Sequence, residues 1–424
     1  MNQNKYIKWT KIRLISIRFF FCYLLFYFLF LSNVYVSFFP FVEHVHRPFK
    51  YISDSFISLV NRFLIHKHFD ADIYTGLGDT SWFFMAAVIY IIIAIVAAFI
   101  WTLVDKGKNY KTLFIILHTY ARYYLAFILL AYGLAKLFET QFVEPPPDYL
   151  IQPLGNIDSH TLMWTFMGAS ESYNYFSGLL ETIAGLFLLF RRTAIFGALV
   201  SITIFTQVLF LNIGYDTLVK ALVAHLLFIN LFILSPAARS LWNFFMAKKS
   251  ASLTTYLTIK VKPEYRWIRY GLKAILIGFV VFGLLKSQID SRANYTKSYF
   301  GGIDGIYEAK EFFRNQQALP PLTTDTLRWR RIAINKFGNM AVQFMNDSTA
   351  QYGILVDTMT RTMALNDWND STFKSKLHYS IISPAEYLFE GSFKHDSIKI
   401  VAQKRRLDNL PLLRDKGKIK WVWW

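Results

Sequence analysis

The sequence predicts an α-helical membrane bundle of about seven spans, followed by a C-terminal all-β domain with a meander or barrel-like fold. Three observations lead to this prediction. Of the 424 residues, 54% are hydrophobic and 17% are charged, whereas soluble domains carry about 25% charge. Apolar runs long enough to cross a bilayer recur over the first two-thirds of the chain. From Gly305 onward, apolar residues follow the period of two that is typical of strands.

Seven segments reach the length of about 17–25 residues that a spanning helix needs. They are 17–39, 81–104, 112–138, 172–190, 194–212, 217–235 and 267–287. The first follows a basic stretch, is too long for a signal-peptide core and has no small-residue cleavage site after it, so we interpret it as an uncleaved anchor. Apolar residues at helical spacing between Phe56 and Leu64 predict a helix that lies on the membrane surface.

Basic residues set the predicted orientation. With the N-terminus inside, the inner connections hold 17 Lys and Arg residues and the outer connections hold 4. This asymmetry follows the positive-inside rule and places the region from Gln288 outside, which in a bacterium is the periplasm. The net charge of +18 therefore indicates membrane topology, and no motif favours nucleic acid as a partner. The acidic connection 140–171, which contains the run Pro145–Pro147, is expected to fold over the mouth of the bundle.

The β domain is predicted from many short runs separated by turn residues, the pattern of an antiparallel sandwich or a small up-and-down barrel. The predicted strands are Gly305–Glu311, Arg328–Asn335, Met340–Asn346, Tyr352–Asp357, Arg361–Leu365, Lys376–Ile382, Glu386–Gly391, Ser397–Lys404 and Lys418–Trp424. In the last of these, alternate aromatic residues indicate a closing strand with one core face, or an aromatic anchor in the lipid interface.

A polar stripe on the fourth span marks the candidate site. Its members are spaced by three or four residues, which places them on one helical face: Glu171, Asn174, Gly178, Glu181 and Gly185. Glycines on a membrane helix usually mark close helix contact, so Glu181 is expected to point into the bundle. It lies about 13–14 Å along the helix from its outer end, near the midplane.

Other spans supply partners for this acid. Arg122, Gly133 and Lys136 share a face of the third span, while Asp216 and Lys220 begin the sixth and Asn212 ends the fifth. Charged residues inside membrane spans usually face a bundle interior and pair with one another. Two interpretations stay open. Glu181 pairs with Lys136 or Lys220 and only fixes the helix register, or the same groups bind a polar or redox-active small molecule, or pass a proton.

Other cofactors and metals find less support in the sequence. The chain has one cysteine, Cys22, which rules out an internal disulfide, a CxxC pair and a Cys-ligated iron–sulfur cluster. His118 and His225 lie at similar depths, but His225 is not on the Lys220 face, so the pattern does not favour haem. The pairs His44/His46 and His66/His68 are more typical of solvated histidines than of a metal site, and no metal site is predicted.

The polar positions resemble those of the DoxX-like membrane protein family. Arg122 and Tyr132–Leu137 resemble its first core helix, Glu181–Thr193 the second, and Asn212–Lys220 the outer turn into the fourth. The resemblance covers about 112–240 and implies a four-helix membrane core, and Thr326–Arg330 is similar to a subgroup with an added β domain. The predicted organisation is an N-terminal membrane region with two spans and an amphipathic outer loop, the DoxX-like core, an inner loop with the seventh span, and an extracytoplasmic β domain: 1–111, 112–240, 241–287 and 288–424.

The resemblance implies a quinone- or redox-linked membrane subunit, because the family takes its name from a thiosulfate:quinone oxidoreductase subunit. Under this hypothesis Glu181, with Lys136 or Lys220, handles protons near a quinone headgroup. Arg122, Asn212 and Asp216 would contribute to cofactor binding. The alternative hypothesis is a non-enzymatic binding or assembly module, whose outer β domain docks an envelope protein, a lipid or another envelope component.

Overall fold

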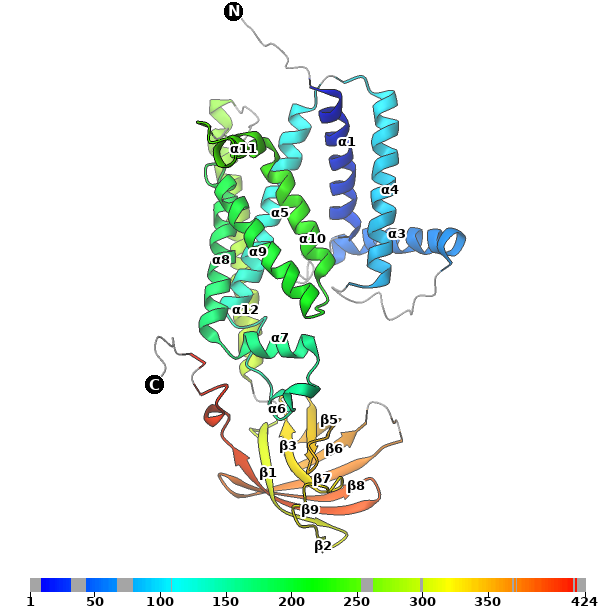
Figure 1. The fold of residues 1–424 in the computed structure, drawn as a ribbon, viewed down its shortest axis with the longest axis vertical. Coiled ribbons are helices and arrows are strands. Elements are labelled where there is room, and N and C mark those ends of the chain that lie inside the picture. Colours follow the sequence, from blue (N-terminus) through cyan, green and yellow to red (C-terminus); the bar gives the residue numbers. More distant parts are fainter. Residues whose placement is uncertain are drawn as a thin grey trace, which may run out of the picture. The chain divides into compact units, whose positions relative to one another are not determined.

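A computed structural model describes residues 9–31, 43–66, 79–107, 109–252, 262–297, 300–367, 370, 372–414 and 416–417. The chain divides into two compact units (Figure 1). The first, here called the helical unit, comprises Met1–Ala135 and Ser177–Ile289. The second, here called the barrel unit, comprises Lys136–Phe176 and Asp290–Trp424.

Long helices follow the order predicted from the apolar segments. They are α1 (Lys11–Phe26) with its continuation η1 (Tyr27–Leu31), α3 (Glu43–Val60) with η3 (Asn61–Ile65), α4 (Ser81–Val104), α5 (Lys111–Leu137), α8 (Glu171–Leu189), α9 (Ala194–Gly214), α10 (Lys220–Leu234), η6 (Ser235–Ala237), α11 (Ala238–Phe245), η7 (Pro263–Tyr265) and α12 (Arg266–Thr296). The part of the first predicted span beyond Leu31 lies outside the described residues, as does His68.

Six helical segments of the described chain are long and apolar enough to cross a membrane. They are Lys11–Leu31, Ser81–Val104, Lys111–Leu137, Ala194–Gly214, Lys220–Phe245 and Pro263–Thr296. The fourth predicted span, 172–190, is helical as α8 but is not among these six. Its polar stripe, which includes Asn174 and Glu181, lowers its apolar character below that of its neighbours.

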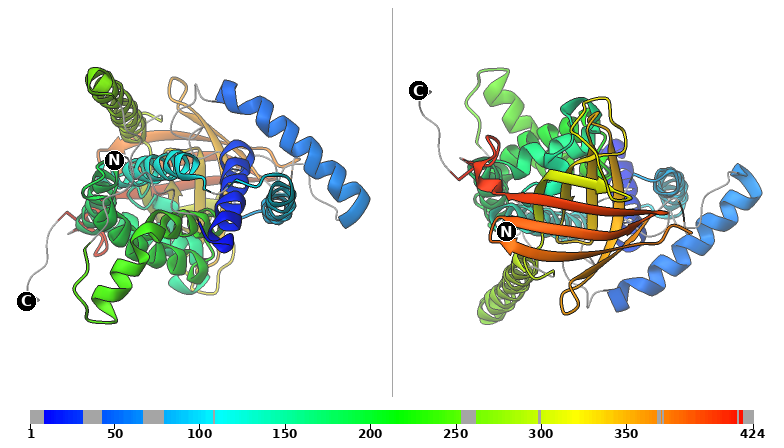
Figure 2. Two further views of the ribbon diagram at one scale, coloured as in Figure 1. Left: turned by 90° about the horizontal axis from the view of Figure 1, so that it is seen from above. Right: turned by 90° about the horizontal axis from the view of Figure 1, so that it is seen from below.

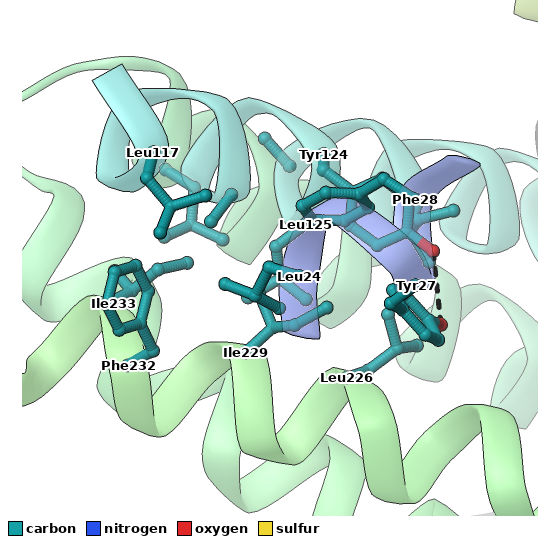
Figure 3. Close-up of a cluster of buried hydrophobic side chains, with 14 of the residues drawn as sticks. Leu24, Tyr27, Phe28, Leu117, Tyr124, Leu125, Leu226, Ile229, Phe232 and Ile233 are labelled. Atoms are coloured by element: carbon teal, nitrogen blue, oxygen red, sulfur yellow. Dashed lines mark hydrogen bonds between the residues drawn. The ribbon is translucent and has the colours of Figure 1, made fainter. Parts of the chain in front are cut away.

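The core of the helical unit lies where α1, α5 and α10 meet (Figure 3). Leu24, Leu125 and Ile229 come from these three helices and are almost fully buried. At one end of the cluster the hydroxyls of Tyr27 and Tyr124 lie 3.4 Å apart, within hydrogen-bond distance. Large side chains of this kind dominate the packing energy of a helix interface. The cluster therefore joins the N-terminal helix to two helices of the predicted 112–240 core.

The β domain is a closed, up-and-down antiparallel barrel. Its sheet has the order β2-β1-β3-β4-β5-β6-β7-β8-β9, and β1 also pairs with β9, so that eight strands close the barrel and β2 extends one side of β1. The strands are β1 (Gly305–Arg314), β2 (Gln317–Ala318), β3 (Trp329–Ile334), β4 (Asn339–Phe344), β5 (Thr349–Asp357), β6 (Thr362–Asn366), β7 (Ser375–Ser383), β8 (Glu386–Phe393) and β9 (Asp396–Arg405).

Eight of the nine predicted strands correspond to the eight that close the barrel, which decides between the barrel and the sandwich in favour of the barrel. The ninth, Lys418–Trp424, lies outside the described residues. The sequence did not predict β2, which is two residues long and pairs at Phe313↔Ala318 and Arg314↔Gln317. A pairing of that length leaves almost no periodic pattern to detect.

Aromatic side chains fill the barrel. Tyr307, Trp329 and Phe389 are almost completely buried and belong to one core cluster. The ring centroids of Tyr307 and Phe389 lie 5.2 Å apart at 84°, an edge-to-face contact across the interior. Interiors of eight-stranded barrels are narrow enough for side chains to fill. The centre of this barrel is therefore a packed core.

The connection between α5 and α8 packs with the barrel. It contains α6 (Pro147–Leu150), η5 (Leu154–Asn156) and α7 (Ser159–Gly168). Next to α6, Ile151 joins Ile306, Ala333 and Ala341 in a small buried cluster on the outer face of β1, β3 and β4. The expected position of this connection over the mouth of the helical bundle stays a prediction. Small and apolar outward positions on three neighbouring strands give this segment a surface to cover.

Polar contacts also hold the connection to the barrel. Asn335 Nδ2 donates a 3.1 Å hydrogen bond to Asp148 Oδ1, and both side chains are buried. Lys416 Nζ, beyond the last strand and η8 (Leu407–Asn409), lies 2.6 Å from Glu144 Oε2 and 3.2 Å from Glu171 Oε1. Glu139 Oε2 pairs with Arg292 Nη2 at 2.8 Å. These contacts tie 136–176 to 290–417 as one unit.

We expect Asp148 to make the stability of the barrel unit depend on pH. Burial raises the pKa of its carboxyl, and the hydrogen bond from Asn335 opposes this shift. Because the folded state then holds the proton more tightly than the unfolded chain, the contribution of Asp148 to stability falls as pH rises from its unfolded pKa through its raised folded pKa. In Asp148→Asn the gain in melting temperature over the wild type should be larger at about pH 8, where an unfolded aspartate is ionised, than at about pH 4. If near-ultraviolet circular dichroism gives the same difference in melting temperature between variant and wild type at every pH, the prediction is wrong.

Candidate functional site

Helices α5 and α8 approach each other closely at glycines. A Cβ added to Gly133 would lie against Thr182 Oγ1 and 2.8 Å from the carbonyl oxygen of Gly178. A Cβ added to Gly185 would lie 2.9 Å from the carbonyl oxygen of Ala126. Such distances leave no room for a side chain, so the polar stripe of α8 faces α5, as the sequence predicts.

Glu181 is buried on this face of α8. Its side chain is 5% exposed, and it lies three residues after Gly178 and four before Gly185. Tyr132, the residue before Gly133, is close enough to Glu181 to interact with it electrostatically. The adjacent Thr182 Oγ1 is buried and makes no hydrogen bond within the described chain. An acid, a phenol and a hydroxyl therefore gather where the two helices are closest.

Two cations predicted for the site, Arg122 and Lys136, lie on α5. Arg122 is 2% exposed and its Nη1 donates a 2.5 Å hydrogen bond to the carbonyl oxygen of Leu188, near the C-terminus of α8. A cation there complements the negative end of the helix dipole. Lys136 is also buried, and in the barrel unit its Nζ lies 5.8 Å from the ring centroid of Phe142. The pairing of Lys136 with Glu181 stays a prediction.

The acids beside Lys220 in the described structure are Asp216 and Asp79. Its Nζ lies 2.6 Å from Asp216 Oδ1 and 3.9 Å from Asp79 Oδ2. The carboxylate of Asp79 also accepts hydrogen bonds from the backbone N–H groups of Lys220 at 2.7 Å and Ala221 at 2.8 Å. The structure thus brings Asp216 and Lys220 together, as a site at the start of α10. The sequence did not reveal Asp79, since it is 141 residues from Lys220 and no local pattern links the two.

Asp79 caps α10 from a distant part of the chain. A carboxylate that accepts from the first N–H groups of a helix satisfies donors that have no partner in the helix and meets the positive end of its dipole. We expect Asp79→Ala to lower the stability of the helical unit by about 1–2 kcal/mol, measured by thermal unfolding in detergent. Asp290→Ala, at an exposed position of α12, is the matched control, and equal losses in the two variants would contradict the capping role.

Asn212 contributes a buried donor. Its side chain is 4% exposed and its Nδ2 has no hydrogen-bond partner among the described residues. Its own carbonyl oxygen accepts from the N–H of Thr217, whose hydroxyl is likewise buried and without a hydrogen bond in the described chain. Buried polar groups are nearly always hydrogen-bonded, so such donors are suited to bind a polar partner. The place of Asn212 in the candidate site stays a prediction.

The histidines of the spans bond to backbone carbonyls. A ring nitrogen of His118 lies 2.9 Å from the oxygen of Ile233, and one of His225 lies 2.7 Å from the oxygen of Ala221. The ring of His225 also stacks on Tyr27 with centroids 4.7 Å apart. Among the described residues no group of three or more His, Cys, Asp and Glu side chains is placed to hold a metal ion.

Comparison with known proteins gives one informative relative. The chain is 34% identical over 124 residues to the uncharacterised protein YwoB of Bacillus subtilis strain 168. The match covers 29% of this chain and 79% of YwoB. No protein-family profile matches the chain, and no solved structure matches it.

Proposed function

The chain belongs to the same family as YwoB, and we propose that it is an integral membrane protein with a DoxX-like core that binds a polar, redox-active small molecule of the quinone class beside Glu181. The N-terminus would be cytoplasmic and the barrel extracytoplasmic, in the cytoplasmic membrane of a bacterium. The proposal has two parts, the topology of the chain and the site in its helical unit.

The barrel unit is built from two separate stretches of the chain, and this supports the proposed topology. Its two parts, 136–176 and 290–417, are joined by contacts such as Glu139–Arg292 and must lie on one side of the membrane. The chain between them contains α8, α9, α10 and α12. An even number of crossings returns the chain to the same side, so in the proposed topology α8 would cross along with the three more apolar helices. This parity agrees with the basic residues, 17 inside and 4 outside.

Thiol labelling tests this topology, because the chain's own cysteine, Cys22, is buried. In a Cys22→Ala background we expect Ser397→Cys in the barrel to react with a membrane-impermeant maleimide in intact cells. Lys106→Cys, in the connection between α4 and α5, should react only after the membrane is opened. Labelling of both positions in intact cells, or of Lys106→Cys alone, would contradict the proposal.

The observation that carries the site is the burial of Glu181 at the closest approach of α5 and α8. A carboxylate there costs several kcal/mol unless it is paired or used. Ionisable groups inside a membrane bundle often belong to a functional site. Tyr132, Thr182 and the amide of Asn212 are donors of the kind that bind the carbonyl oxygens of a quinone. In this site Glu181 would exchange the proton that accompanies reduction of the headgroup.

The site is tested by what the protein retains. We expect mass spectrometry of gently extracted wild-type protein to detect a bound quinone, and Glu181→Gln to lose it together with quinol-coupled activity. Glu264→Gln, at an exposed position of η7, should behave as the wild type. Wild-type retention and rates in Glu181→Gln would refute the role of this acid.

A second candidate function is a membrane-anchored assembly module, and one feature of the barrel favours it. A surface groove of ≈ 710 Å³ lies at the β8–β9 hairpin and the neighbouring turn of β1, lined by Phe313, Glu390, Lys394 and His395 among others. Mixed charges around an apolar residue suit a protein partner. A photo-cross-linker at Lys394 should capture an envelope protein in cells, whereas one at Gln351, on the exposed surface of β5, should not. A monomer that retains quinone and captures nothing would count against this function.

A further inference from the structure

Helix α3 and its continuation η3 carry three distinct stripes. Positions His46, Ser53 and Ile57 are buried. An exposed apolar stripe repeats at intervals of three and four residues and consists of Val45, Phe49, Ile52, Phe56, Leu59 and Phe63. An exposed polar stripe repeats in the same way and consists of His44, Arg47, Tyr51, Ser55, Ser58 and Arg62. Residues at such intervals share one face of a helix, so the three stripes are three separate faces.

The buried stripe fixes α3 within the helical unit. Tyr90 of α4 donates a 2.8 Å hydrogen bond from its hydroxyl to Ser53 Oγ. The ring of Phe49 lies 6.2 Å from that of Phe30 in η1. Ile57 is completely buried. These contacts hold α3 across the direction of α1 and α4 (Figure 1), at the edge of the helical unit (Figure 2).

The depth of this contact bears on what covers the apolar stripe. Tyr90 is nine residues after Ser81, the first residue of α4, which corresponds to about 13–14 Å along the helix. The segment of α4 that follows exposes Ile91, Ile92, Ile95 and Val96. Helix α3 thus lies beside the apolar surface of a candidate span and not beyond its end. If lipid covers this surface of α4, it continues onto the apolar stripe.

We propose that α3 and η3 lie in the outer leaflet of the bilayer, with the apolar stripe in the acyl region and the polar stripe towards headgroups and water. This inference rests on the proposed membrane topology. A helix with one apolar and one polar exposed face binds in this way, and basic residues on the polar face attract lipid phosphates. Arg47 and Arg62 occupy those positions. The helix would set the depth at which the first two spans sit.

Spin labels distinguish this arrangement from the alternatives. In the Cys22→Ala chain, reconstituted in vesicles of phosphatidylcholine and phosphatidylglycerol, single cysteines are placed at Ile52 and Leu59 on the apolar stripe and at Ser55 and Ser58 on the polar stripe. All four positions are exposed, so the label disturbs no packing. Power saturation measures accessibility to oxygen, which concentrates in lipid, and to a water-soluble nickel complex. The oxygen-to-nickel ratio should be several-fold higher at Ile52 and Leu59 than at Ser55 and Ser58.

A label at Ile92 on α4 separates two kinds of failure. If Ile92 reports lipid while Ile52 and Leu59 give the ratio of the polar stripe, α3 lies in water and the inference is wrong. Low accessibility to both reagents at Ile52 and Leu59 would mean that a second copy or another protein covers the stripe, which also overturns it. If Ile92 itself favours nickel, the proposed membrane topology fails first.

Discussion

Gly133→Ala is expected to destabilise the helical unit by about 2–3 kcal/mol, because overpacking a close contact forces the backbone apart. The added methyl would lie 2.8 Å from two backbone atoms of α8, the carbonyl oxygen of Gly178 and the amide nitrogen of Thr182. Neither atom can move without shifting the helix. Separation of α5 from α8 would also change the surroundings of Glu181, so the variant should lose the small molecule proposed to bind there. Thermal unfolding in detergent and mass spectrometry of retained molecules measure the two effects.

Gly278→Ala is the matched control. Gly278 also lies within a long helix, α12, but a Cβ there would meet no atom within 4 Å. The same substitution should then leave stability unchanged, or raise it by roughly 1 kcal/mol through helix propensity. If both variants melt together at the wild-type temperature, the close approach of α5 and α8 is not as described.

Arg292→Ala is expected to destabilise the barrel unit by about 2 kcal/mol. Its guanidinium is 2.8 Å from the carboxylate of Glu139, whose side chain is 6% exposed. Removal of the cation would leave a buried carboxylate with a 3.1 Å hydrogen bond from the hydroxyl of Tyr175. Breaking a buried ion pair costs about 3–5 kcal/mol, and the 40% exposure of Arg292 reduces that value. The rate of limited proteolysis within residues 136–176 should rise as the stability of the barrel unit falls.

Arg330→Ala tests whether burial of the acid is the cause. Arg330 is also 40% exposed and pairs with Asp347, but this aspartate is 54% exposed. Exposed pairs contribute about 0–1 kcal/mol, so this variant should melt close to the wild type. A loss in Arg330→Ala equal to that in Arg292→Ala would remove the argument from burial.

The sequence was enough to predict the long helices and the barrel because both rest on periodicity. Apolar runs of spanning length and strands with alternating apolar residues, such as β7 and β9, each carry their signal locally. Closure of β1 on β9 and the packing of Ile151 on the outside of the barrel had no such signal. Both depend on residues far apart in sequence.

In the candidate site, too, features with a local sequence pattern were predictable and contacts between distant segments were not. The stripe of glycines predicted which face of α8 turns into the bundle, and hence the burial of Glu181. The contact of Lys220 with Asp216 was not predicted, because Lys220 was expected to pair with Glu181. Asp79 escaped prediction because it reaches α10 from before α4. Because Asp79 and Asp216 lie beside Lys220, the charge of Lys220 is balanced at the start of α10 without Glu181.

The central claim is that Glu181 lies in a polar site open to a small molecule, and chemical labelling of its carboxyl tests it most directly. Membranes containing the protein are treated with a hydrophobic carbodiimide, which reaches carboxyls in apolar surroundings, and the modified residues are mapped by peptide mass spectrometry. We predict modification at Glu181 and its protection by a short-chain quinone, with no protection of the exposed Glu264. Modification of Glu181 that quinone leaves unchanged would contradict the proposed site.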